Sequence, residues 1–186
     1  MDLPTILSGP ILRRVEPSHV YIWIALCKRL NIGGKLYRID KNTKQETFSY
    51  HEIESQSETT TIRVGTRLYI SLIKLTPVQQ TFPTNILIGY NLFFKTSSGI
   101  QDLQDFNLLS PSNLNSIVYG NLAYPSFHIP EQNQTQILYG SCRKLHGKSK
   151  DALSQADKKI ASAYLEIEKR PSALFLMGDQ IYDGSK

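Results

Sequence analysis

A succession of short runs rich in β-branched and aromatic residues most constrains the fold of the first two thirds of the chain. Val20–Leu26 is one such run, and Lys35–Ile39 alternates polar with apolar residues after the turn-type residues Asn31–Gly34. These patterns favour strands, because such side chains pack well on a pleated, partly buried surface. Further strands are expected at Thr61–Leu75, Ile86–Phe94 and Ile117–Tyr119. Short strands separated by turn residues predict an antiparallel β-sandwich over residues 1–130.

The pattern changes after Pro130, where the boundary between two domains is expected. Ile137–Tyr139 is a short apolar run, and apolar residues then recur at spacings of three and four from Leu153 to Ile167. That spacing predicts an amphipathic helix, which Pro171 ends. The uninterrupted apolar run Ala173–Met177 follows. Strand, helix and strand within this length predict a βαβ unit with parallel strands, so residues 131–186 are expected to begin an α/β domain.

Composition and charge limit the classes of partner. The chain has 186 residues and a formal net charge of +5, with 21 Lys and Arg against 16 Asp and Glu. The basic residues are scattered, so they predict a solvated surface and no nucleic-acid-binding module. No apolar run approaches the roughly 18 residues of a membrane helix, and no membrane partner is expected. Met1–Pro4 lacks the basic and apolar regions of a signal peptide, so a cytoplasmic location is expected; the oligomeric state is left open.

The residues with chemical potential follow the two predicted parallel strands. Cys142 comes shortly after the first strand and Asp179 shortly after the second. Ligands of parallel α/β sheets bind outside the carboxyl ends of the strands, and adjacent strands lie about 5 Å apart. A thiolate and a carboxylate at one edge can share a metal ion, with Tyr182 turning back toward it. A cysteine ligand favours a softer or more highly charged transition metal over Mg²⁺ or Ca²⁺.

Structural roles remain open for each of these residues. Cys142 is equally the kind of small apolar residue that is buried at a strand end, the Gly178-Asp179 pair also fits a turn or a helix cap, and Tyr182 also fits a packing role. A different function is also open, a nucleotide-binding loop at Gly147-Lys148-Ser149. A strict P-loop needs four residues between its first glycine and this triplet, whereas Ser141 to His146 make six, so only a looser anion-binding loop is compatible.

Two segments, Gly140–Lys144 and Arg170–Tyr182, together resemble the opening of the metallophosphoesterase domain in the alkaline phosphatase D (PhoD-like) family. The stretch Gly9–Trp23 also resembles the sandwich that precedes this domain in such proteins. The resemblance implies an Ig/fibronectin-like sandwich over residues 1–130 and the first βαβ unit of a metallophosphoesterase domain over residues 131–186.

The same resemblance implies hydrolysis of phosphate mono- or diesters at a dinuclear metal centre, with iron and calcium as the expected metals. Carried over by position, Cys142, Asp179 and Tyr182 are metal ligands and Asp179 bridges the metals. Arg143 also matches the motif, and our own hypothesis is that it contacts the phosphoester substrate. Family members continue well beyond the tyrosine, so this chain is expected to hold only part of the ligand set and to be inactive alone. The alternative from another class is a non-catalytic β-sandwich binding module.

Overall fold

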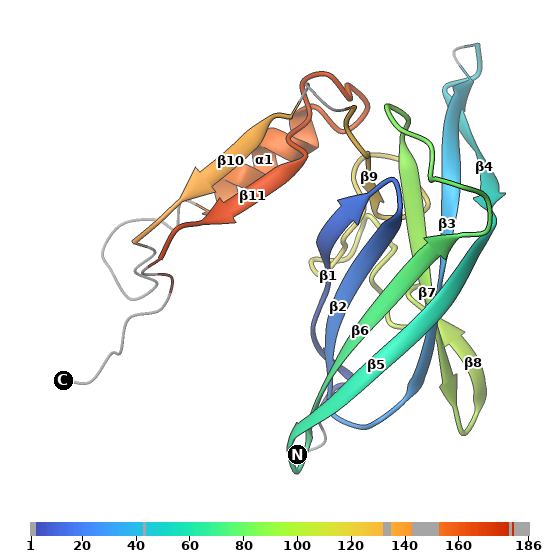
Figure 1. Cartoon of the computed structure of the whole chain (residues 1–186), viewed down its shortest axis with the longest axis vertical. Helices are drawn as coiled ribbons and strands as arrows, with labels where there is room; N and C mark the ends of the chain where they lie inside the picture. The colour runs from blue at the N-terminus through green and yellow to red at the C-terminus, as the bar shows by residue number, and fades with distance from the viewer. Residues whose placement is uncertain (1–2, 43, 132–134, 143–152, 179, 181–186) are drawn as a thin grey trace. The chain divides into compact units, whose positions relative to one another are not determined.

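Residues 3–42, 44–131, 135–142, 153–178 and 180 are described by the structure, which is a computed structural model. The chain separates into two compact units, Met1–Ile129 and Pro130–Lys186. The first unit contains strands β1 to β9, and the second contains β10, α1 and β11 (Figure 1). No helix among the described residues has the length and apolar character needed to cross a bilayer.

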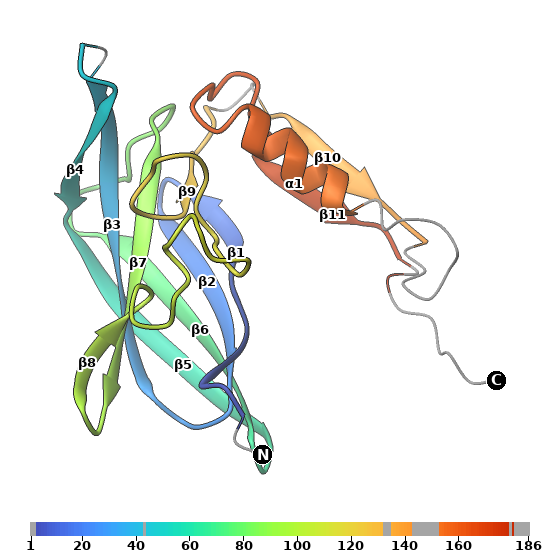
Figure 2. The same ribbon diagram turned by 180° about the vertical axis from the view of Figure 1, so that it is seen from behind.

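The first sheet of the first unit, sheet A, is antiparallel and has the strand order β1-β2-β6-β5 (Figure 2). Its strands are β1 (Ile6–Glu16), β2 (His19–Leu26), β6 (Leu68–Pro77) and β5 (Ser55–Gly65). Alternation along β2 sets the two faces: Val20, Ile22 and Ile24 are fully buried, whereas Tyr21 and Trp23 between them are half-buried.

The second sheet, sheet B, has the order β4-β3-β7-β8, and β9 also pairs with β7. Its strands are β4 (Thr47–Ile53), β3 (Asn31–Asn42), β7 (Ile88–Thr96), β8 (Gly99–Asp102) and β9 (Ser126–Phe127). All pairings in it are antiparallel. Side chains of β5 link the two sheets: the Gly34 N–H donates to Ser57 Oγ at 2.9 Å, and Thr59 Oγ1 donates to the Ile32 carbonyl at 2.5 Å.

Buried apolar side chains from both sheets form one core, an arrangement compatible with a β-sandwich. Its fully buried members include Ile22, Ile73, Leu36, Leu92 and Phe94. Gly34 lies where the sheets approach closely, since a Cβ there would meet side-chain carbons of Leu75 at 3.2 Å and Leu92 at 3.3 Å.

Several expected elements differ from those observed. Asn31–Gly34 is not a turn but the beginning of β3, because glycine there permits the close packing of Leu75 and Leu92. Thr61–Leu75 is not one strand: a turn after Gly65 divides it between β5 and β6. Ile117–Tyr119 is irregular and belongs to the long segment between β8 and β9.

The second unit has a parallel strand pair, as the sequence predicts. β10 (Ile137–Gly140) pairs with β11 (Ala173–Leu176) in the register Ile137 with Ala173 to Gly140 with Leu176. Between them in sequence lies α1 (Leu153–Ser162), which ends earlier than the expected Ile167 because the chain continues in turns. Apolar side chains of this unit are exposed, with Tyr139 at 78%, Phe175 at 54% and Met177 at 68%.

Candidate functional site

The candidate site lies where β10 and β11 end side by side. Beyond the last paired residues, the Met177 N–H donates to the Gly140 carbonyl at 2.8 Å. One step further, the Cys142 N–H donates to the Gly178 carbonyl at 3.2 Å. The first bond continues the parallel register of the strands. The second is shifted by one residue, because in that register the Cys142 N–H would meet the Met177 carbonyl. The backbone thus brings Cys142 against the residue that directly precedes Asp179.

Cys142 has a backbone conformation that residues other than glycine rarely adopt. Its φ is +56°, in the left-handed region, and its side chain is exposed. For a residue with a Cβ this conformation costs about 1 kcal/mol relative to the right-handed region. Gly178 also has a positive φ, +104°, but glycine adopts it without that cost. Unfavourable backbone conformations of this kind cluster at functional sites, so Cys142 is the most informative described residue of this edge.

Gln180 spans the ends of both strands. Its Nε2 donates to the Gly178 carbonyl at 2.6 Å and lies 3.5 Å from the Gly140 carbonyl. The side chain therefore ties the segment after β11 to the end of β10. Gln180 has no predicted role from the sequence, although it lies within Arg170–Tyr182. Its place as a polar residue directly after the predicted ligand Asp179 is the signal that could have identified it.

The remaining predicted site residues fall outside the described residues. These are Arg143, Asp179 and Tyr182, and the Gly147-Lys148-Ser149 loop lies outside them as well. Within the described part of the chain, no group of three His, Cys, Asp or Glu side chains is placed to hold a metal ion. Cys142 is the predicted ligand whose position is described, and an exposed thiol at a strand end has the donor chemistry of a transition-metal ligand.

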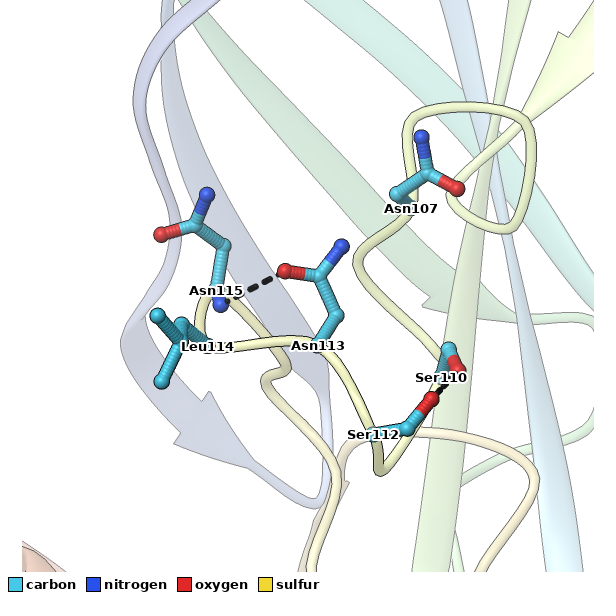
Figure 3. A pocket seen from close by; sticks show the side chains of 6 residues that line it. All are labelled: Asn107, Ser110, Ser112, Asn113, Leu114 and Asn115. Carbon is cyan, nitrogen blue, oxygen red and sulfur yellow. Dashed lines mark hydrogen bonds between the residues drawn. The ribbon is translucent and has the colours of Figure 1, made fainter.

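A separate hollow of about 540 Å³ lies in the long loop between β8 and β9 (Figure 3). It is lined by neutral side chains: Asn107, Ser110, Ser112, Asn113, Leu114 and Asn115. The two serine hydroxyls are 2.9 Å apart and bond to each other, and the Asn113 side chain accepts from the Asn115 N–H at 3.0 Å. With no acid or base in its lining, this hollow lacks the groups needed for proton transfer or for nucleophile activation.

A second hollow, of about 270 Å³, is lined by residues of β3, β4 and the segment after β6, among them Arg38, His51 and Thr81. Arg38 Nε donates to Asp40 Oδ1 at 2.9 Å, and His51 Nε2 lies 3.8 Å from Asp40 Oδ2. The His51 to Asp40 distance is too long for the hydrogen bond that orients a catalytic histidine. Neither hollow contains a predicted site residue, so the strand ends of the second unit remain the candidate site.

Comparison with known proteins gives only distant structural likeness. No family model matches the sequence, and no curated protein sequence matches it. The chain is structurally similar to the purple acid phosphatase PPD1 isolated from yellow lupin (Lupinus luteus) seeds, with a TM-score of 0.40 and 11% sequence identity. The match covers 94% of this chain and 34% of that protein, so the chain spans about a third of the length of that phosphatase. At this TM-score and identity, the likeness carries no inference about activity.

Proposed function

We propose that the chain carries part of the metal centre of a PhoD-like metallophosphoesterase, an enzyme that hydrolyses phosphate mono- or diesters. The observation that supports this most directly is the hydrogen bond from the Cys142 N–H to the Gly178 carbonyl at 3.2 Å. It brings the segments Gly140–Lys144 and Arg170–Tyr182 together at the carboxyl ends of parallel strands, where α/β proteins bind their ligands.

In this proposal Cys142, Asp179 and Tyr182 would hold the metals, and Arg143 would contact the phosphate. When bound, a dinuclear iron and calcium centre supplies Lewis acidity and an activated water for attack on phosphorus. Cys142 would contribute a thiolate from a backbone position held by its hydrogen bond to Gly178, and Gln180 holds the segment after β11 against both strand ends. We further propose that residues 1–130 are an Ig/fibronectin-like domain preceding this centre, and that the chain alone, with part of the ligand set, is inactive.

Metal binding by the whole chain tests the proposal, with cobalt(II) as the probe because cobalt–thiolate bonds absorb in the near ultraviolet. The chain has two cysteines, which gives a matched control. We expect Cys142→Ser to abolish the thiolate absorption and to weaken cobalt binding at least about tenfold. Cys27→Ser should leave both unchanged, since Cys27 lies in the first unit.

Equal binding by the two variants, or no binding by the wild-type chain, would contradict the proposal. A folded chain that binds no metal would instead favour the non-catalytic binding module. Atomic emission analysis of the same samples after loading with iron and calcium measures the stoichiometry independently of the optical signal.

A further inference from the structure

The outward side of sheet A carries a contiguous apolar surface. Ile11 on β1 pairs with Trp23 on β2, and Trp23 pairs with Leu72 on β6, so these three side chains form one cross-strand row. In the next row Ile70 on β6 pairs with Ile62 on β5, and their neighbour Ala25 on β2 is buried at 4% exposure. We name the outer apolar face by its members Ile11, Trp23, Ile62, Val64, Ile70 and Leu72.

This surface is unusual for a sheet whose other side faces a core. In such sheets the outward residues are normally polar, giving alternation along each strand. Here Ile62 is 56% exposed, Val64 55% and Ile11 46%. Single exposed apolar residues need no explanation, but a contiguous group on one flat face marks an interaction surface.

The charges beside the outer apolar face are arranged so that the face can pair with itself. The adjoining row runs Arg14, Tyr21, Lys74 and Glu58, from β1 to β5. A two-fold axis parallel to the strands, between β2 and β6, would set β1 of one copy over β5 of the other. Arg14, whose Nε pairs with Glu16 Oε1 at 2.5 Å in its own copy, would then also face the partner's Glu58. Lys74 would face the ring of the partner's Tyr21. The same axis sets Trp23 against the partner's Leu72.

The available area fits a specific but weak dimer. Four strands about 4.8 Å apart and three rows about 6.8 Å apart span on the order of 400 Å² per copy. Two such faces bury about 800 Å², within the range of weak, transient protein interfaces. We propose that a second copy of this chain binds to the outer apolar face in this two-fold arrangement, with a dissociation constant in the micromolar range.

Sedimentation equilibrium of the full chain over a range of protein concentrations tests this dimer. Ile62→Glu places a carboxylate on the face, and we expect it to raise the dissociation constant at least about tenfold. Ile100→Glu is the matched control, since Ile100 is also an exposed isoleucine of the first unit, at 74%, but lies on β8 of sheet B. It should leave the constant unchanged. Circular dichroism of each variant confirms that the fold is retained.

A charge exchange tests the two-fold arrangement itself. Arg14→Glu alone and Glu58→Arg alone should each weaken the dimer by setting like charges opposite one another. The double variant restores opposite charges across the interface and should recover most of the lost affinity. A chain that stays monomeric at several hundred micromolar would overturn the proposal. So would a double variant that shows no recovery, or a dimer lost on Tyr139→Glu in the second unit but retained in Ile62→Glu.

Discussion

Gly9 and Gly99 both have left-handed backbone conformations, with φ of +89° and +120°, but their surroundings differ. A Cβ at Gly9 would lie 3.0 Å from the Trp23 carbonyl oxygen, whereas a Cβ at Gly99 meets nothing within 4 Å. Gly99→Ala should therefore cost only the conformational strain, about 1–2 kcal/mol of unfolding free energy. Gly9→Ala should cost about 1–3 kcal/mol more, because backbone must move. Urea denaturation measures both, and equal losses would contradict the steric argument.

The stacked rings of Tyr37 and Tyr124 give a prediction about the stability of the fold at alkaline pH. Burial, followed by the neighbouring Tyr124, raises the pKa of Tyr37 to about 12, and the two rings stack with centroids 4.7 Å apart. The folded state thus favours neutral Tyr37, so its contribution to stability is complete below about pH 10 and is lost as the pH rises toward 12. Tyr37→Phe should show a smaller fall in urea midpoint across that range. An unchanged fall would show that Tyr37 ionises equally easily in both states.

At the scale of elements, β5 of sheet A and β3 of sheet B are linked by side-chain hydrogen bonds, although the two strands do not pair through their backbones. Thr59 Oγ1 donates to the Ile32 carbonyl at 2.5 Å, while Thr60, the next residue, is exposed on the outward side of the same strand. Thr59→Val keeps the shape and removes the hydroxyl, so we expect a loss of about 1 kcal/mol of unfolding free energy. Thr60→Val, the matched control, should change stability by less than about 0.5 kcal/mol. Similar values for both would mean that the hydroxyl does not connect the sheets.

Local sequence patterns predicted the elements whose residues alternate or run together without interruption. Val20–Leu26, Ile86–Phe94 and Ala173–Met177 all correspond to observed strands, and the parallel pairing of β10 and β11 is confirmed. β1 was not identified from its residues, because Gly9-Pro10 and Arg13-Arg14 interrupt its apolar pattern. The segment Asn31–Gly34 was predicted as a turn because of its glycines. Gly34 instead makes room for Leu75 and Leu92, which lie far away in sequence, so the local pattern could not show this role.

The candidate site could be predicted only as far as the strand order. The βαβ pattern placed the residues after β10 and β11 at one edge, and the hydrogen bond from Cys142 to Gly178 lies at that edge. The left-handed conformation of Cys142 could not be predicted, because cysteine has no preference for it. The bridging position of Gln180 depends on strand ends that only the folded chain brings together. The ligand roles of Cys142, Asp179 and Tyr182 stay predictions.

At the scale of the whole molecule, the two units differ in how much apolar surface they bury. Every fully buried member of the core cluster belongs to the first unit, from Val20 to Ile129. In the second unit, Ile137, Leu174 and Leu176 are each about half exposed, at 51%, 50% and 52%. Two strands with one helix bury too little surface for independent stability, and parallel sheets are normally covered on both faces.

This difference predicts separate levels of amide protection, which hydrogen exchange with mass spectrometry measures. Amides of β2 and β6 should open only by global unfolding of the first unit, whereas amides of β10 and β11 should exchange by local opening at a much lower free energy. If Cys142 belongs to a metal centre, saturating cobalt(II) should slow exchange in β10 and β11 selectively, because a ligand that binds only the folded unit stabilises it. Cys142→Ser should abolish that slowing and Cys27→Ser should not. Equal protection of β2 and β10 without metal would instead show that the exposed apolar side chains of the second unit are covered in solution.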